Sequence, residues 1–166
     1  MDMGRDEAAI ESLEQALAIA REVKRRGGEA NSLQNLGNAH RNLKRYEQAL
    51  EYYGQALAMQ REVKNRMGEG SLLNSLGGVA HSLRQYDKAI EYSEQALAIA
   101  REVKERADEA AALRNLARTE RDRGNLARAR SLLEQDLAIN EALRADIYNP
   151  LSRATYFATQ QSALDT

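Results

Sequence analysis

The ten residues Gln15-Ala-Leu-Ala-Ile-Ala-Arg-Glu-Val-Lys24 return unchanged at Gln95–Lys104. A copy with two substitutions lies between them at Gln55–Lys64, and a more divergent copy begins at Gln135. Successive copies therefore begin 40 residues apart. A fixed period of this length is typical of proteins that are built from stacked, similar units.

Working outward from this motif, other residues keep the same register. They are Leu33, Leu73 and Leu113; Leu36, Leu76 and Leu116; Ala49, Ala89 and Ala129; and Tyr46 and Tyr86. In the first unit, apolar residues at three- and four-residue steps predict one helix over about 29–43 and a second over about 46–66. The pairs Gly27-Gly28, Met67-Gly68 and Ala107-Asp108 are predicted to mark the turns between units, because glycine suits a helix C-terminus.

The composition points to a soluble, all-α protein. The chain has 166 residues, 30% of them charged, with 24 Lys+Arg against 25 Asp+Glu and a net charge of −1. This balance favours neither nucleic acid nor an anionic membrane as a partner. A single proline permits long helices, and the absence of cysteine excludes disulfides, thiolate metal sites and cysteine nucleophiles. We expect no metal and no cofactor.

The N-terminal sequence gives no targeting signal. Residues 1–7 are acidic and include no apolar stretch, unlike a secretory signal. The plainly apolar runs reach only about five residues, whereas a membrane-spanning helix needs about 20. We therefore expect a cytoplasmic protein.

The pattern Leu33-x-x-Leu36-Gly37-x-x-His40, followed by Tyr46, Ala49, Tyr53 and Ala56, resembles the tetratricopeptide repeat (TPR). The period exceeds the family's usual 34 residues, and resembles the longer-helix variants of kinesin light chains and bacterial multi-repeat scaffolds. The resemblance covers about residues 6–143 and implies a right-handed superhelical solenoid of antiparallel helix pairs. The third copy departs from the pattern at three positions, which are Ala117, Leu133 and Asp136.

The resemblance divides the chain into a half repeat (6–26), three repeats (29–66, 69–106 and 109–145) and a C-terminal capping segment (146–166). Asn149-Pro150 predicts the start of a last helix. Its apolar residues would cover the last repeat, and they are Leu151, Ala154, Phe157 and Ala158. We thus expect seven repeat helices and one terminal helix. The Arg153-x-x-Tyr156-Phe157-Ala158 core also resembles the segment that follows the repeats in bacterial, especially cyanobacterial, proteins with a CHAT domain, a caspase-like peptidase.

No pattern of catalytic residues is visible, and we expect no enzyme. His40 and His81 occupy different positions of the repeat, which favours packing or solvated roles over metal binding or catalysis. Most glutamates have a basic residue four positions away, as solvated helix surfaces do. Gly27-Gly28 and Gly77-Gly78 have no Gly-Lys-Ser/Thr sequence and are not phosphate loops.

The better functional signal is the concave surface, which the first helices of successive units line in a stacked array. Amides there can pair with the backbone of a peptide, and arginines suit carboxylates. The predicted groove residues are Gln34, Asn35, Asn38, Arg41, Asn42, Asn74, Ser75, His81, Arg114, Asn115, Arg118 and Arg121. Arg114, Arg118 and Arg121 form one stripe that no nearby acid fully compensates, which indicates an acidic partner.

Two hypotheses follow for the function. The first is a protein–protein interaction scaffold that binds an internal peptide or protein surface, including the recognition part of a CHAT-type system. Capture of a free C-terminus is less favoured, because Gln34 and Asn74 stand where such a site needs Lys or Arg. The alternative is a structural module that self-associates through the array ends, or a consensus-like stabilised array with no dedicated ligand.

Overall fold

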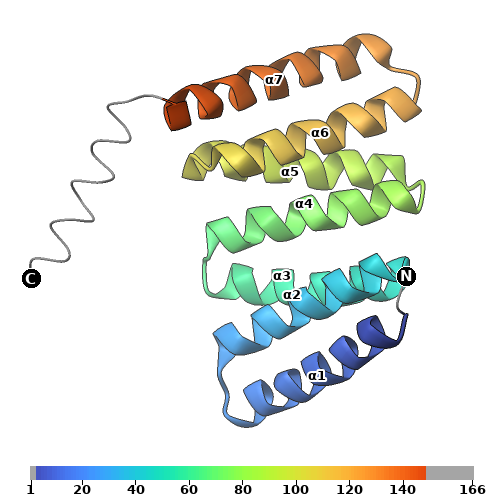
Figure 1. Ribbon diagram of the computed structural model, residues 1–166, viewed down its shortest axis with the longest axis vertical. Coiled ribbons are helices and arrows are strands. Elements are labelled where there is room, and N and C mark those ends of the chain that lie inside the picture. The colour runs from blue at the N-terminus through green and yellow to red at the C-terminus, as the bar shows by residue number, and fades with distance from the viewer. Residues whose placement is uncertain (1–2, 149–166) are drawn as a thin grey trace, which may run out of the picture.

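The computed structural model describes residues 3–148, and within this range it contains seven helices and no strand (Figure 1). The helices are α1 (Met3–Glu22), α2 (Arg26–Asn42), α3 (Tyr46–Glu62), α4 (Arg66–Ser82), α5 (Tyr86–Val103), α6 (Arg106–Asp122) and α7 (Leu126–Tyr148). This confirms the all-α prediction and the number of repeat helices. The terminal helix expected after Asn149 lies outside the described residues.

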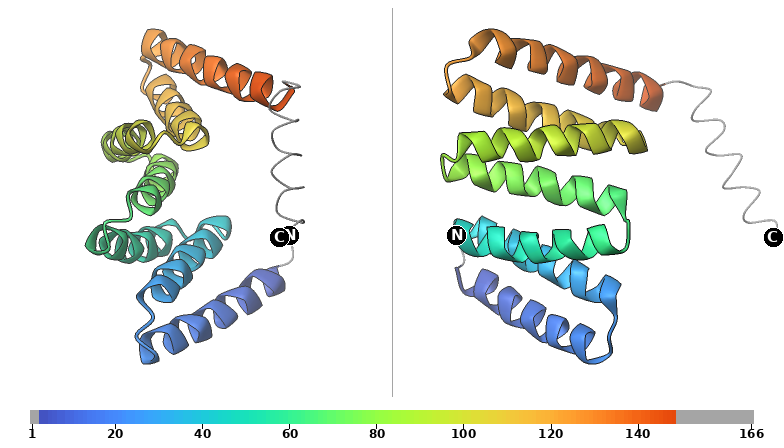
Figure 2. Two further views of the ribbon diagram at one scale, coloured as in Figure 1. Left: turned by 90° about the vertical axis from the view of Figure 1, so that its left-hand side faces the viewer. Right: turned by 180° about the vertical axis from the view of Figure 1, so that it is seen from behind.

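Each helix packs against the next one in the chain, and α4 also contacts α6. In the left view of Figure 2, α3 and α5 lie on one side of the row, while α2, α4 and α6 lie on the other. The short turns force neighbouring helices to run antiparallel. The described residues therefore form the solenoid of helix pairs that the 40-residue period predicts.

A residue with positive φ ends each helix from α1 to α6, and these residues recur every 20 positions. They are Lys24, Lys44, Lys64, Arg84, Lys104 and Gly124. The N–H of the residue that follows donates to the carbonyl five positions back, as in Arg25 N to Ala20 O (2.8 Å) and Asn65 N to Gln60 O (2.9 Å). These are Schellman-type helix ends, so one repeat is two helix–turn units of equal length.

The prediction that glycine pairs mark the turns was wrong. Gly27-Gly28, Met67-Gly68 and Ala107-Asp108 lie inside the first turns of α2, α4 and α6. A basic residue takes the left-handed position instead, where the Schellman hydrogen bonds hold it. Gly68 has a different purpose, because a Cβ there would lie 2.7 Å from the Gln60 side chain. Close packing between helices requires glycine at this position.

The core is thin and consists mainly of leucine and alanine, as the composition predicts. The in-register leucines of α2, α4 and α6 are all at most 3% exposed, and Ala49, Ala89 and Tyr53 are fully buried. His40 is buried and stacks on Tyr52, with ring centroids 5.1 Å apart. The structure thus gives His40 the packing role expected from its position.

We expect Ala89→Leu to lower the free energy of unfolding by about 1–3 kcal/mol, because its slot is fully occupied. Glu62→Gln removes only an exposed ion pair with Arg26 and should change stability by no more than about 0.5 kcal/mol. Urea denaturation followed by circular dichroism measures both. Equal losses in the two variants would contradict this assignment of the helix faces.

The repeated motif also builds a ladder of polar contacts along one side of the array. Arg61 Nε lies 2.8 Å from Glu69 Oε1, and Arg61 Nη2 lies 3.4 Å from Gln95 Oε1. The same pair of contacts recurs from Arg21 to Glu29 and Gln55, and from Arg101 to Glu109 and Gln135. Burial tends to raise the pKa of Glu69, but Arg61 and Arg66 outweigh it and hold this pKa below its usual value.

Candidate functional site

A polar hollow of about 440 Å³ lies between α4 and α6, on the side of the array that these helices share with α2. Its lining consists of Arg41, Ser71, Asn74, Ser75, Gly78, Ser82, Asp108, Ala111, Asn115 and Arg118. Five of the predicted groove residues therefore meet in one place. Gly78 keeps the hollow open, since a Cβ there would have no neighbour closer than 3.9 Å.

Asn74 and Asn115 connect the two helices at the base of this hollow. Asn74 Nδ2 donates to the carbonyl of Asp108 (3.2 Å), and Asn115 Nδ2 donates to the carbonyl of Asn74 (3.1 Å). Asn74 is only 9% exposed, although its Oδ1 has no hydrogen-bond partner among the described residues. The prediction that Asn74 offers its whole amide to a peptide backbone was wrong, because its nitrogen serves the packing of α4 against α6.

The predicted residues of α2 lie apart from this hollow, with the exception of Arg41. Asn35 and Asn42 are exposed and Gln34 is half-buried. Asn38 Oδ1 accepts a hydrogen bond from the Tyr53 hydroxyl (2.6 Å), so part of this amide stabilises the first repeat.

The arginine stripe of α6 is better compensated than the sequence indicated. Arg114 Nη1 lies 2.8 Å from Asp136 Oδ1 on α7, and Arg121 lies 2.9 Å from Asp122. Arg118 donates to Asn115 Oδ1 at 3.4 Å and has no carboxylate partner among the described residues. The expectation of three uncompensated arginines was therefore wrong, and Arg118 is the one that remains available to a ligand.

His81 joins α4 to α6 at the edge of the same face. Its Nε2 lies 3.0 Å from Asp122 Oδ2. Burial, aided by the charge of Arg118, holds the pKa of His81 below its ordinary value, although Asp122 acts in the opposite direction. Arg121, with help from His81, lowers the pKa of Asp122. His81 thus contributes a contact between two helices of the predicted groove.

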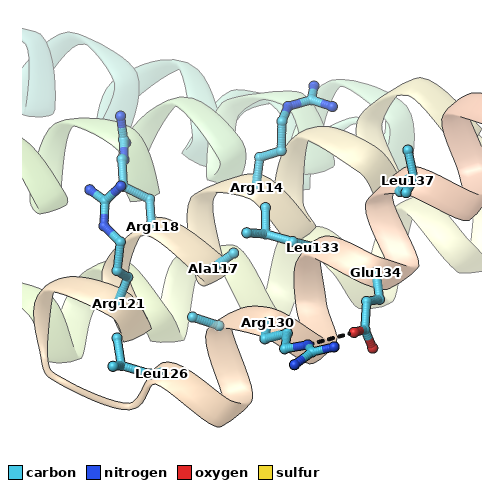
Figure 3. A pocket seen from close by; sticks show the side chains of 10 residues that line it. Arg114, Ala117, Arg118, Arg121, Leu126, Arg130, Leu133, Glu134 and Leu137 are labelled. Atoms are coloured by element: carbon cyan, nitrogen blue, oxygen red, sulfur yellow. Dashed lines mark hydrogen bonds and ion pairs between the residues drawn. The ribbon is translucent and has the colours of Figure 1, made fainter.

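A second hollow, of about 650 Å³, lies between α6 and α7 (Figure 3). Its lining combines the three arginines of α6 with an apolar row on α7 and consists of Arg114, Ala117, Arg118, Arg121, Leu126, Ala129, Arg130, Leu133, Glu134 and Leu137. Leu126, Leu133 and Leu137 are 65%, 51% and 57% exposed. Sequence reasoning missed this apolar row, because it assigned Leu133 to the slot that Tyr53 fills in the first repeat.

Two kinds of site find no support in residues 3–148. No group of histidine and acidic side chains there could hold a metal ion. None of these helices is both long and apolar enough to cross a membrane.

The tetratricopeptide repeat profile matches residues 1–62 and 69–142. The chain belongs to the TPR family. This family's fold is typical of protein–protein interaction scaffolds, which agrees with the coarse functional prediction. No curated protein matches the sequence of this TPR chain.

Solved TPR structures share its architecture. BtubC (BKLC) from P. vanneervenii is 27% identical, with a TM-score of 0.79 over 89% of this chain and 60% of BtubC. A putative kinesin light chain with nearly identical TPR-like repeats, from Podosopora anserina, is 26% identical, with a TM-score of 0.70 over 85% of this chain and 69% of that one. The TPR sensor protein PH0952 of the STAND class, from Pyrococcus horikoshii, shares the fold at 23% identity and a TM-score of 0.76, over 91% of this chain and 23% of that one.

The kinesin-light-chain resemblance of the TPR repeats is thus confirmed, and the chain spans about 60% of the length of BtubC. The residues that resemble CHAT-domain proteins, 153–158, lie outside the described part of the chain. A link to a CHAT-type peptidase stays a prediction.

Proposed function

We propose that this TPR protein is a scaffold that binds an extended, acidic segment of a partner protein in the polar hollow between α4 and α6. The observation that carries this proposal is the gathering of Arg41, Arg118 and polar groups of two successive helices around one open space. Hydroxyl and amide groups can both donate to and accept from a peptide backbone. Arg41 and Arg118 are exposed and can form charge-assisted hydrogen bonds with carboxylates.

The buried, unpaired Asn74 Oδ1 supports the same proposal. An acceptor without a partner costs free energy in the folded protein, and a backbone N–H of a bound segment would satisfy it. Asp108 is the single acid in the lining, and burial, followed by the charge of Glu105, raises its pKa. The hollow therefore presents more positive than negative charge to a ligand.

The test is capture of partners from the source cell by the intact chain, followed by measurement of the affinity of each captured protein for two variants. Arg118→Glu should weaken binding by about tenfold or more, because it replaces attraction to a carboxylate with repulsion. Lys88→Glu is the matched control, since it makes the same change of charge at an exposed position of α5, outside the hollow. Binding should also weaken with salt. Equal affinities for Arg118→Glu and the parent chain would contradict the proposal.

Self-association through the array ends is the second candidate, and the open face of α1 favours it. Ile19 is 60% exposed, whereas Ile99, at the same position of a later unit, is 4% exposed. Light scattering over a range of concentrations distinguishes the two functions: a molar mass that rises without a partner supports self-association.

A further inference from the structure

We infer that the hollow between α6 and α7 is a second binding site, which receives an amphipathic helix of a partner protein. This helix has leucine-type side chains on one face and carboxylates at the edge of that face. The inference shares with the proposed function only the premise that the protein is an interaction scaffold. Leu133, Leu137 and Arg130 line this hollow and not the one between α4 and α6.

The shape of the site follows from comparison with the earlier helix pairs. Tyr53 and Leu57 of α3 are 0% and 7% exposed and belong to a core that includes leucines of α4. In the next unit, Leu97 of α5 packs against the apolar residues of α6. A helix thus packs against each of these faces. Leu133 and Leu137 are the equivalents of Tyr53 and Leu57, and both are more than half exposed. The surface of α7 is therefore formed to accept a helix.

The charges indicate which kind of helix fits. Arg130 stands where the earlier units have Leu50 and Ile90, both half-buried. Arg118 stands where they have Asn38 and Gly78. Charged residues at these positions would oppose a neutral helix like those inside the array, because their desolvation would be uncompensated. They suit a helix that brings its own carboxylates.

Two of the cations in the lining can form new ion pairs. Arg118 has no carboxylate partner among the described residues. Arg130 pairs with Glu134 at 2.9 Å, but the two side chains are 83% and 63% exposed, so this contact is weak and exchangeable. Arg114 and Arg121 already pair with Asp136 and Asp122. The partner helix should therefore carry one carboxylate opposite Arg118 and a second near Arg130.

Residues 149–166 of the chain match this description less well. They contain one basic and one acidic side chain, Arg153 and Asp165, and thus no excess of acid. An acidic helix of another protein has the better charge complementarity with the arginines of the site.

The test uses the full chain and a labelled, helix-forming synthetic peptide with a leucine face and flanking glutamates. A second peptide has the same composition but distributes its leucines around the helix. Fluorescence anisotropy should show binding of the first peptide only. Leu133→Ser together with Leu137→Ser should weaken this binding by about tenfold or more. Arg130→Glu should weaken it severalfold and reduce its salt dependence.

Val23→Ser is the matched control, because Val23 is 62% exposed on α1 at the other end of the array, and its affinity should equal that of the parent chain. The inference is overturned if the parent chain fails to bind the first peptide or binds both peptides equally. It is also overturned if light scattering shows a dimer of the parent chain that the Leu133 and Leu137 substitutions dissociate, since a second copy would then occupy the site. Arg118→Glu reports on the other hollow as well, so the Leu133 and Leu137 variant distinguishes failure here from failure of the proposed function.

Discussion

Gly37→Ala should lower the free energy of unfolding by about 3 kcal/mol, at the upper end of what overpacking of a core costs. A Cβ at Gly37 would lie 2.5 Å from Cδ1 and Cε1 of the Tyr53 ring. The ring is fully buried, and its hydroxyl donates to Asn38 Oδ1 at 2.6 Å, so it cannot turn away without losing this hydrogen bond. Urea denaturation followed by circular dichroism measures the loss.

Gly54→Ala is the control for this substitution. Gly54 lies on the exposed side of α3, and a Cβ there would have no neighbour within 4 Å. Alanine should therefore stabilise the helix by about 0.5–1 kcal/mol, through its higher helix propensity. If both variants gain stability, the contact between α2 and the Tyr53 ring does not exist in solution.

The second large effect is expected for Arg114→Glu, which should lower the free energy of unfolding by about 2–4 kcal/mol. Arg114 is the ion-pair partner of Asp136, whose side chain is only 12% exposed and also accepts from Asn140 Nδ2. The substitution removes the cation and places a second carboxylate beside a poorly solvated one. Loss of one member of such a pair leaves the other uncompensated.

Arg118→Glu, one turn further along α6, should change the stability by no more than about 0.5 kcal/mol, because Arg118 is exposed and contacts only an amide. Thermal or urea denaturation of the two variants side by side tests the difference. Similar stabilities would mean that the Arg114–Asp136 pair contributes little. Arg118 is also the better position for charge reversal in binding experiments, since Arg114→Glu would confound lost binding with lost stability.

The sequence was sufficient to predict the fold, because residues in register at a 40-residue spacing report on repeated packing. Leu36, Leu76 and Leu116 are buried for the same reason in each unit. The helix ends were harder to predict. Lysine and arginine occupy the left-handed positions, and nothing in a basic side chain signals that conformation, whereas the glycines that suggested turns lie within helices.

The site was predictable only in outline. Its helix faces follow from the periodicity, and Arg41, Ser75 and Arg118 do line one hollow. The hydrogen bond from Asn74 to Asp108 and the ion pair between Arg114 and Asp136 join residues that are 34 and 22 positions apart. Such contacts depend on how far one helix is displaced along the next, which a repeat pattern does not specify. The apolar row of α7 was missed for a related reason: the burial of a helix face depends on its neighbouring helices as well as on its own sequence.

The polar ladder bears on how such a chain could have grown. Gln55 contacts Arg21, Gln95 contacts Arg61 and Gln135 contacts Arg101, so each unit presents to the next the same contacts that it receives from the one before. A duplicated segment of 40 residues, inserted at any of these boundaries, would meet compatible neighbours on both sides without a single compensating substitution. A segment of half that length would place the inner helix of a pair where an outer one belongs. Gene duplication in this lineage is therefore free to proceed by whole helix pairs, and the near-identity of Gln15–Lys24 and Gln95–Lys104 is the trace that recent events of that kind would leave behind.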